Sequence, residues 1–227
     1  MKTIVIIPAY NEELNIEKTI EDVKKNAPYV DYIVINDGSR DDTLSILEKH
    51  HYSYINGVCN LGLFGAVQTG FRFAIENQYD CAIQFDGDGQ HSAKYIRYML
   101  DEIQNGNDIV IGSRFVTDKK PFTIRMIGSR LISIAIRLVT GKIITDPTSG
   151  FRAYSRNCIF DYAMDSNNPP EPDTLVYMLR KGKKIKEIQV NMKEREFGES
   201  YLNLSNSIRY MLRMLISIFL IQPFRKK

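Results

Sequence analysis

The chain has 227 residues, of which 44% are hydrophobic and 25% charged, and its net charge is +3 at neutral pH. This length favours one large α/β domain over two independent ones. The composition excludes a disordered, collagen-like or disulfide-rich chain, and the weak net charge predicts no nucleic-acid partner. The three cysteines are widely spaced and form no C-x-x-C pair, which argues against a disulfide framework or a zinc site and favours a reducing, cytoplasmic compartment.

Short apolar runs alternate with amphipathic segments through the first half of the chain. Strands are expected at 4–7, 32–35, 53–56, 81–85 and 108–111. Helices are expected between them at 15–26, 42–50, 65–77 and 93–104. Apolar strands that alternate with helices predict a parallel sheet covered on both faces. The first apolar run ends at Pro8 and is too short for the core of a signal peptide.

The second half is less regular. Its expected elements are a helix at 123–139, a turn-rich loop at 145–150, a strand at 151–154, a helix at 173–180, a strand at 184–190 and a last helix from about 205 to 221. No run of about 18 apolar residues is present, so the sequence predicts no conventional membrane span.

The last helix is predicted to be amphipathic. Its apolar side carries Ile208, Leu212, Leu215, Ile216 and Phe219, and its basic residues are Arg209, Arg213 and Arg225. This pattern predicts a helix that lies on a membrane surface or against a small membrane protein partner. The alternative is that the apolar side packs on the protein's own core.

Polar clusters follow four of the predicted strands, at residues 8–12, 36–39, 86–91 and 112–114. In parallel sheets, ligands bind beyond the carboxyl ends of the strands. The four clusters are therefore expected to meet at one edge of the sheet and to form a binding site there.

Asp86 and Asp88 give the sharpest chemical signal in the sequence. Residues two apart in an extended segment project to the same side, so the two carboxylates can hold one hard divalent cation together with diphosphate oxygens and water. Gln90 adds a neutral oxygen. An isolated Asp-Gly pair is usually a solvated turn, but the position after a buried strand favours a metal site.

Other ion and phosphate motifs are excluded. In a calcium EF-hand loop that began at Asp86, the sixth residue would be Gly and the twelfth Glu, whereas this chain has His91 and Arg97. Neither G-x-x-x-x-G-K-[ST] nor G-x-G-x-x-G occurs. The segment 62–65 opens a predicted helix whose N-terminus suits a phosphate, but glycines before helices are common.

Three motifs in order carry a family resemblance: I-P-A-Y-N-E-E at 7–13, N-D-G-S at 36–39 and D-G-D-G-Q-H at 86–91. With them the chain resembles family 2 glycosyltransferases, most closely the polyprenyl-phosphate mannosyl- and glucosyltransferase branch. D-P-T-S-G-F-R-A-Y at 146–154 and R-E-F-G-E-S at 195–200 strengthen the match, which extends to about residue 200.

The resemblance implies an α/β protein with the GT-A fold, in which a mostly parallel nucleotide-binding sheet is covered by helices. The expected glycosyltransferase domain spans 1–204. Its nucleotide-sugar-binding half is 1–115 and its acceptor half 116–204, followed by the amphipathic helix and basic tail at 205–227.

The resemblance also implies roles for single residues. Pro8, Tyr10 and Glu12 would line the nucleoside, and Asp37 would hydrogen-bond the base. Asp86 would face the ribose or donor sugar, while Asp88 and Gln90 would hold Mg²⁺ or Mn²⁺ against the diphosphate. The candidates for phosphate binding are Arg114, Arg130 and Arg195, because a planar guanidinium grips phosphate oxygens.

Two further segments bear on the acceptor. Ser200 shares the R-x-x-G-x-S motif with Arg195 and is a substrate-binding candidate, but Tyr201 stands where polyprenyl-phosphate enzymes often have Lys. In P-P-E-P-D at 169–173, Glu171 or Asp173 is a candidate catalytic base. The alternative for Asp173 is that it caps the following helix.

The expected reaction is an inverting, metal-dependent transfer of a sugar from a nucleotide-sugar donor, with UDP first and GDP second. The expected acceptor is a polyprenyl phosphate or a cell-envelope glycan at the cytoplasmic face of a membrane. One alternative is a non-catalytic nucleotide-sugar-binding subunit of a membrane complex. Another is a sugar nucleotidyltransferase, whose glycine-rich, Arg-containing loop near the N-terminus is absent here.

Overall fold

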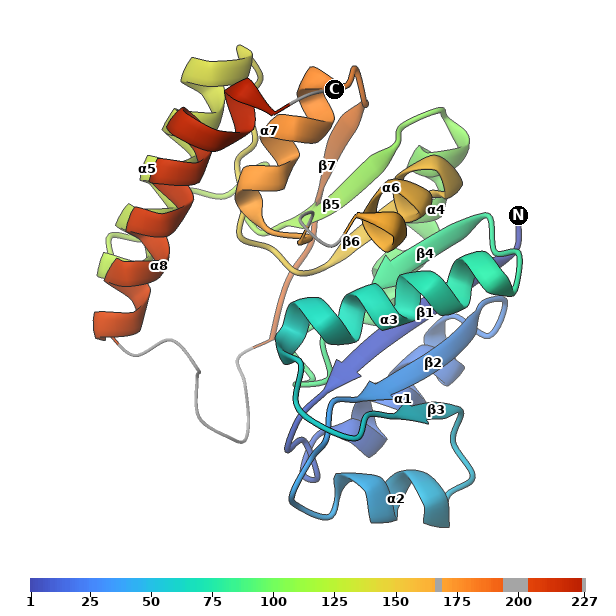
Figure 1. Ribbon diagram of the computed structural model, residues 1–227. Helices are drawn as coiled ribbons and strands as arrows, with labels where there is room; N and C mark the ends of the chain where they lie inside the picture. The colour runs from blue at the N-terminus through green and yellow to red at the C-terminus, as the bar shows by residue number, and fades with distance from the viewer. Residues whose placement is uncertain (166–168, 194–203, 226–227) are drawn as a thin grey trace.

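The structure is a computed structural model that describes residues 1–165, 169–193 and 204–225. Within these residues, one sheet has seven strands in the order β3-β2-β1-β4-β6-β5-β7, and helices lie on both of its faces (Figure 1). The strands are β1 (Thr3–Ala9), β2 (Asp31–Asn36), β3 (Tyr54–Asn56), β4 (Cys81–Gln84), β5 (Ile109–Ser113), β6 (Arg152–Ser155) and β7 (Ile185–Gln189). Strand β6 is antiparallel to its neighbours β4 and β5, and the other strand pairs are parallel.

Strand β1 is buried along its whole length and divides the core in two. Ile4 and Ile6 face one cluster and Val5 and Ile7 the other, because successive side chains of a strand point to opposite faces. Helix α3 approaches β1 closely at Gly70, where a Cβ would lie 2.3 Å from a side-chain carbon of Ile6. The apolar run at the start of the sequence therefore forms a central strand between two helical layers.

One helical layer consists of α1 (Ile16–Asn26), α2 (Thr43–Lys49) and α4 (Ile96–Gln104). The other consists of α3 (Gly62–Glu76), α5 (Ile124–Thr140), α6 (Arg156–Met164), α7 (Pro172–Arg180) and the C-terminal helix. In each helix the apolar residues recur at helical spacing and form the buried face. Helix α1 buries Ile16, Ile20 and Val23 in this way.

The C-terminal helix has three parts: α8 (Leu204–Ile216), a π-helical turn η2 (Ser217–Ile221) and a 3-10 turn η3 (Gln222–Phe224). It lies beside α5 and α7. In the part of the chain that the structure describes, no helix has the length and apolarity that crossing a membrane requires.

The expected elements agree with the structure to within a few residues, and the mostly parallel α/β sheet is confirmed. Two features were not predicted. Helix α6 is short, and its sequence is only weakly amphipathic, so no periodic signal marks it. The antiparallel insertion of β6 between β4 and β5 was also missed, because periodicity identifies a strand without giving its direction.

Strand order places the ligand-binding edge. From β1 the chain moves outward to β2 and β3, and then returns to the other side of β1 with β4. The crevice between the carboxyl ends of β1 and β4 is thus a topological switch point, where open α/β sheets bind ligands.

Candidate active site

The loops after β1 and β2 are tied to each other at the carboxyl edge of the sheet. The backbone N–H of Asn11 donates to Ser39 Oγ (3.0 Å), and the N–H of Arg40 donates to Asn11 Oδ1 (2.8 Å). Asn11 has a φ of 56°, in the left-handed region that Asn tolerates better than most residues. These bonds give the I-P-A-Y-N-E-E segment a fixed shape.

The four predicted nucleoside-side residues lie at the end of β1 and in these two loops. Pro8 is buried, Tyr10 is exposed and Glu12 is half-buried, accepting a hydrogen bond from the Asn15 amide (2.8 Å). Asp37 is buried, and its carboxylate accepts a hydrogen bond from the N–H of Leu61 (2.8 Å), just before α3. The structure thus brings together the residues that the resemblance assigned to the nucleoside.

The D-G-D-G-Q-H loop follows β4 and touches the carboxyl end of β1. At Gly87, a Cβ would lie 2.9 Å from the Pro8 carbonyl oxygen, so the close approach of this loop to β1 requires glycine. The Gly87 carbonyl accepts a hydrogen bond from Thr19 Oγ1 of α1 (3.2 Å). Asp86 and Asp88 therefore stand at the switch point between β1 and β4.

Asp88 and Gln90 are both held in place within this loop. The backbone N–H of Gln90 donates to Asp88 Oδ1 (3.1 Å). The Gln90 side-chain amide donates to the Lys193 carbonyl (3.3 Å), and the Lys193 N–H donates back to the Gln90 carbonyl (2.9 Å). The loop is thereby tied to the chain segment that leads to Arg195.

Asp86 is oriented by His91, a residue that the sequence reasoning quoted but assigned no role. His91 Nε2 lies 3.1 Å from Asp86 Oδ2. The His91 ring is buried and stacks on Phe151, with 4.9 Å between the ring centroids. A Cβ at residue 150 would lie 2.5 Å from Asp86 Oδ2, so Gly150 leaves the space that this carboxylate occupies. The segments 86–91 and 146–154 therefore form one site.

Two opposing effects act on the Asp86 carboxyl. Burial raises its pKa, but hydrogen bonds from His91 and Gln84 and the positive charge of Arg152 outweigh burial and hold the pKa below its usual value. Asp86 is therefore a carboxylate at neutral pH, able to accept a hydroxyl hydrogen bond or to ligate a cation.

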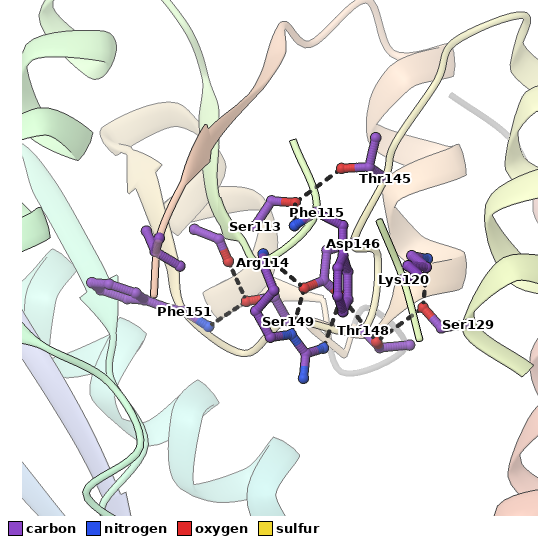
Figure 2. Close-up of polar contacts among 12 residues, drawn as sticks. Ser113, Arg114, Phe115, Lys120, Ser129, Thr145, Asp146, Thr148, Ser149 and Phe151 are labelled. Carbon is purple, nitrogen blue, oxygen red and sulfur yellow. Dashed lines mark hydrogen bonds and ion pairs between the residues drawn. The ribbon is translucent and has the colours of Figure 1, made fainter. Parts of the chain in front are cut away.

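Arg114 follows β5 and is held by a buried carboxylate (Figure 2). Its Nε and Nη2 donate to the two oxygens of Asp146, at 2.8 and 2.9 Å. Asp146 is fully buried, whereas the Arg114 side chain is partly exposed. Glu187 on β7 fixes the Asp146 loop by accepting hydrogen bonds from the N–H groups of Thr145 (2.6 Å) and Asp146 (2.7 Å).

Lys120 and Arg130 add two cations beside Arg114. Lys120 Nζ donates to Ser129 Oγ (2.9 Å) and Ser133 Oγ (3.3 Å) of α5, and Figure 2 shows its contact with Ser129. Arg130 donates to the Lys120 carbonyl and lies over the Phe122 ring, 4.4 Å from its centroid. Burial lowers the pKa of Lys120, as do the charges of Arg114 and Arg130. No motif in the sequence pointed to Lys120.

Glu171 and Asp173 lie at the start of α7, where the C-terminal helix binds both. Arg213 Nη2 is 2.9 Å from each Glu171 carboxylate oxygen. Ser217 Oγ (2.5 Å) and the Gln222 amide (3.0 Å) donate to Asp173 Oδ2. The N-cap position of α7 is Glu171, so Asp173 is not the capping residue that the alternative supposed. Burial raises the pKa of Glu171, against the opposing effect of Arg213.

Arg152 links the two parts of the acceptor half. Its guanidinium is buried and donates to the carbonyl oxygens of Pro147 (2.6 Å), Ser149 (2.8 Å) and Pro170 (3.0 Å). The loop after Asp146 and the segment before Glu171 are thereby held together. The sequence signal for this role is a lone Arg in the apolar run F-R-A-Y.

The donor set at the switch point fits Mg²⁺ or Mn²⁺. Such cations take one or two carboxylates and fill the remaining positions with water and substrate phosphate oxygens. Asp86, Asp88 and Gln90 offer two carboxylates and an amide oxygen. Among the described residues, no three His, Cys, Asp or Glu side chains converge as metal ligands. Arg195, Ser200 and Tyr201 lie outside the described residues.

The fold and the strand-end loops together define a GT-A glycosyltransferase. Residues 4–160 match the family described as Glycosyl transferase family 2, and the chain belongs to this family.

Named relatives agree with the branch that the motifs indicated. Undecaprenyl-phosphate mannosyltransferase of Micrococcus luteus is 31% identical over 216 residues, which cover 89% of this chain and 88% of that protein. Polyprenol monophosphomannose synthase of Mycolicibacterium smegmatis is 29% identical over 226 residues, covering 94% and 85%. Dolichol-phosphate mannosyltransferase of Pyrococcus furiosus is 32% identical over 225 residues, covering 93% and 62%.

Solved structures agree in fold. Glucosyl-3-phosphoglycerate synthase from Mycobacterium tuberculosis in complex with Mn²⁺, uridine diphosphate and phosphoglyceric acid has a TM-score of 0.70 at 16% identity, covering 100% of this chain and 80% of that one. The same enzyme with phosphoglyceric acid alone gives 0.73 at 18% identity, covering 96% and 79%. At this identity the likeness supports the fold alone.

Proposed function

We propose that this glycosyltransferase moves a sugar from a nucleoside-diphosphate sugar to a polyprenyl phosphate, with inversion at the anomeric carbon. The observation that carries the proposal is the meeting of two groups of side chains across the site. The carboxylates of Asp86 and Asp88 lie at the switch point. Gly150 lies against Asp86 and belongs to the loop of Asp146, which holds Arg114. The carboxylates can hold a cation that binds the donor diphosphate, and the guanidinium of Arg114 can attract an anionic acceptor.

The donor would occupy the β1–β4 crevice. Pro8, Tyr10 and Glu12 would line the nucleoside, with Asp37 on the base, and Asp86 would face the ribose or the donor sugar. Asp88 and Gln90, with Asp86 beside them, would hold Mg²⁺ or Mn²⁺. When bound, the cation supplies positive charge that neutralises the diphosphate leaving group.

The donor nucleotide is UDP or GDP. UDP is the nucleotide bound in the structural relative. The named sequence relatives are mannosyltransferases or a phosphomannose synthase. GDP-mannose is therefore tested beside a UDP-sugar. Side chains near the base do not separate the two.

The acceptor phosphate would lie against Arg114, which Asp146 holds, and against the cations on or beside α5. Arg114 and Arg130 are the candidate phosphate ligands, and Lys120 extends the group. A phosphate oxygen would attack the anomeric carbon from the face opposite the leaving group. The new carbon–oxygen bond forms as the bond to the donor diphosphate breaks, and the nucleoside diphosphate leaves with the electron pair.

A phosphate acceptor needs no general base. Its second pKa is near 6, so the dianion predominates at neutral pH. This agrees with the contacts of the C-terminal helix, in which Arg213 binds both oxygens of Glu171 and Ser217 binds Oδ2 of Asp173. A cell-envelope glycan would require one of these carboxylates to accept a hydroxyl proton. The protein would work at the cytoplasmic face of the membrane that holds the lipid acceptor.

The test is transfer by the purified full chain. UDP-glucose and GDP-mannose, each with Mn²⁺ or Mg²⁺, are mixed with undecaprenyl phosphate in detergent, and the lipid product is identified by mass spectrometry. We expect one donor to yield a glycosyl phospholipid that Asp88→Asn does not make. Donor binding without turnover on any acceptor would instead support a non-catalytic subunit.

A further inference from the structure

Two apolar stripes are exposed on the C-terminal half of the molecule. On α5, the stripe consists of Ile127, Leu131, Ile134 and Leu138, at spacings of four, three and four residues. On the C-terminal helix, it consists of Leu212, Ile216, Phe219 and Leu220. Spacings of three and four place residues on one side of a helix.

The stripes are not part of the hydrophobic core, because each helix packs a different face against that core. Helix α5 buries Ile132, Ala135 and Ile136, and the C-terminal helix buries Met214 and Ile218. Among the residues predicted to form the apolar side of the last helix, Leu212, Ile216 and Phe219 are exposed, whereas Leu215 is half-buried against the core. The side chain of Ile208 is outside the described set.

The two stripes face the same way. The helices lie side by side and run in the same direction (Figure 1), and they meet at Gly128, where a Cβ would lie 1.8 Å from Met211 Sδ. Successive residues of a helix are about 100° apart. Ile127 is one step back from Gly128, and Leu212 is one step forward from Met211. Opposite steps on two parallel, facing helices lead to the same side, so the stripes form one face.

The two chain segments that carry this face contain basic residues and no acidic ones, although Glu171 of α7 pairs with Arg213. Residues 119–143 contain six Lys or Arg and no Asp or Glu, and residues 204–227 contain five Lys or Arg and no Asp or Glu. The chain as a whole has 30 basic and 27 acidic residues, so these two segments depart strongly from its balance. Lys119, Arg137, Lys142 and Arg209 are exposed.

We infer that this paired face of α5 and the C-terminal helix, rather than the C-terminal helix alone, docks on an anionic phospholipid surface. An exposed apolar stripe with basic residues around it inserts at the boundary between headgroups and acyl chains. Each Lys or Arg near an anionic surface adds about 1 kcal/mol of attraction. Neither helix would span the bilayer, and both would lie in its plane.

Docking through α5 also orients the site. The same helix presents Ser129 and Ser133 to Lys120, beside Arg130. The cations proposed for the acceptor phosphate would then lie near the depth of the lipid headgroups. The docking inference itself does not depend on the donor or on the transfer reaction.

The experiment measures sedimentation of the full chain with vesicles of phosphatidylcholine alone or mixed with phosphatidylglycerol. The test variants are Ile134→Glu on α5 and Ile216→Glu on α8. The control is Phe160→Glu on α6, which makes the same charge change outside the proposed face. Ile134, Ile216 and Phe160 are each 54% exposed. Circular dichroism verifies that each variant is folded.

We expect wild type and Phe160→Glu to bind the anionic vesicles, and binding to weaken as salt rises. Ile134→Glu and Ile216→Glu should each weaken binding by about tenfold or more, because each loses an apolar side chain at the interface and gains a negative charge. Unchanged binding by Ile134→Glu would overturn the paired face. Absence of vesicle binding, with a dimer that Ile134→Glu dissociates, would assign the face to a second copy. Sugar transfer in detergent without vesicle binding would sink the docking inference and leave the proposed function standing.

Discussion

Asp146 is fully buried and holds the guanidinium of Arg114 through two hydrogen bonds of 2.8 and 2.9 Å. The family resemblance implies that Arg114 is a phosphate ligand, and its pairing with Asp146 has two consequences. The bidentate contact fixes the direction of the guanidinium fork. It also leaves a buried negative charge that depends on Arg114 for compensation.

The first prediction concerns stability. Arg114→Gln should lower the free energy of unfolding by about 3 kcal/mol, because it leaves the Asp146 carboxylate buried without its cation. Denaturant titration at neutral pH measures the change. The matched control is Arg97→Gln, which removes a well-exposed ion pair with Asp101 on α4 and should cost about 0.5 kcal/mol or less. Equal losses in the two variants would show that Asp146 does not need Arg114.

A second prediction tests the cation site. Asp88→Asn should abolish the Mn²⁺-dependent part of the thermal shift caused by UDP or GDP, because the cation would lose a carboxylate ligand. Chelation of the metal should have the same effect on the wild type. Asp101→Asn, at an exposed position on α4, is the control and should respond to Mn²⁺ as the wild type does. An undiminished shift in Asp88→Asn would reject the assignment.

The sequence was most informative where local chemistry and strand order coincide. Buried strands with polar residues directly after them were enough to predict the sheet and to place Asp37, Asp86 and Asp88 at its carboxyl edge. Periodicity does not say which strands are neighbours, so the contact between Gly150 and Asp86 was out of reach. The resemblance grouped the same motifs without explaining how they touch.

Residues that act through long-range pairing were the ones missed. Lys120 acquires its surroundings from α5, and Glu187 binds a loop about forty positions earlier in the chain. The buried Arg152 binds the nearby carbonyls of Pro147 and Ser149 and also that of Pro170, which is 18 positions away. The partners on other elements lie beyond the reach of a local pattern.

A third prediction distinguishes the two faces of the C-terminal helix. Ile218 is fully buried and its neighbour Phe219 is 42% exposed. Ile218→Ala should therefore lower the free energy of unfolding by about 2–5 kcal/mol, as expected for a buried Ile. Phe219→Ala should change it by about 0.5 kcal/mol or less. Denaturant titration of both variants decides the matter, and similar values would contradict the packing of this helix on the core.

This packing also changes how the helix should be tested for membrane binding. Deleting residues 205–227 would remove Met214 and Ile218 from the core and would also take away the Ser217 and Gln222 hydrogen bonds to Asp173. A truncated chain that failed to bind vesicles would then be uninformative if it were also unfolded. Single substitutions on the exposed stripes avoid this ambiguity.

The last prediction concerns the acceptor, and it depends on ionisation. A dianionic lipid phosphate attacks without losing a proton, whereas a sugar hydroxyl needs a base that contributes roughly 10²–10⁴-fold in rate. We therefore expect Glu171→Gln and Asp173→Asn, made separately, to keep most of the wild-type rate constant at saturating donor. A fall of about 100-fold in either variant, with donor affinity unchanged, would favour a hydroxyl acceptor instead.

The structure supplies the controls for this experiment, because both carboxylates are bound to the C-terminal helix. Arg213→Gln removes the cation that binds Glu171, and Ser217→Ala removes a donor to Asp173, while each leaves the carboxylate itself in place. A base would retain its function in these controls, so a rate lost in Asp173→Asn but kept in Ser217→Ala would identify the carboxylate as the reacting group.

A rate lost equally in both would mean that the helix contact positions the site, and circular dichroism would establish that each variant is folded. Full activity in all four variants, with undecaprenyl phosphate as the acceptor, is the result that the phosphate-acceptor proposal requires.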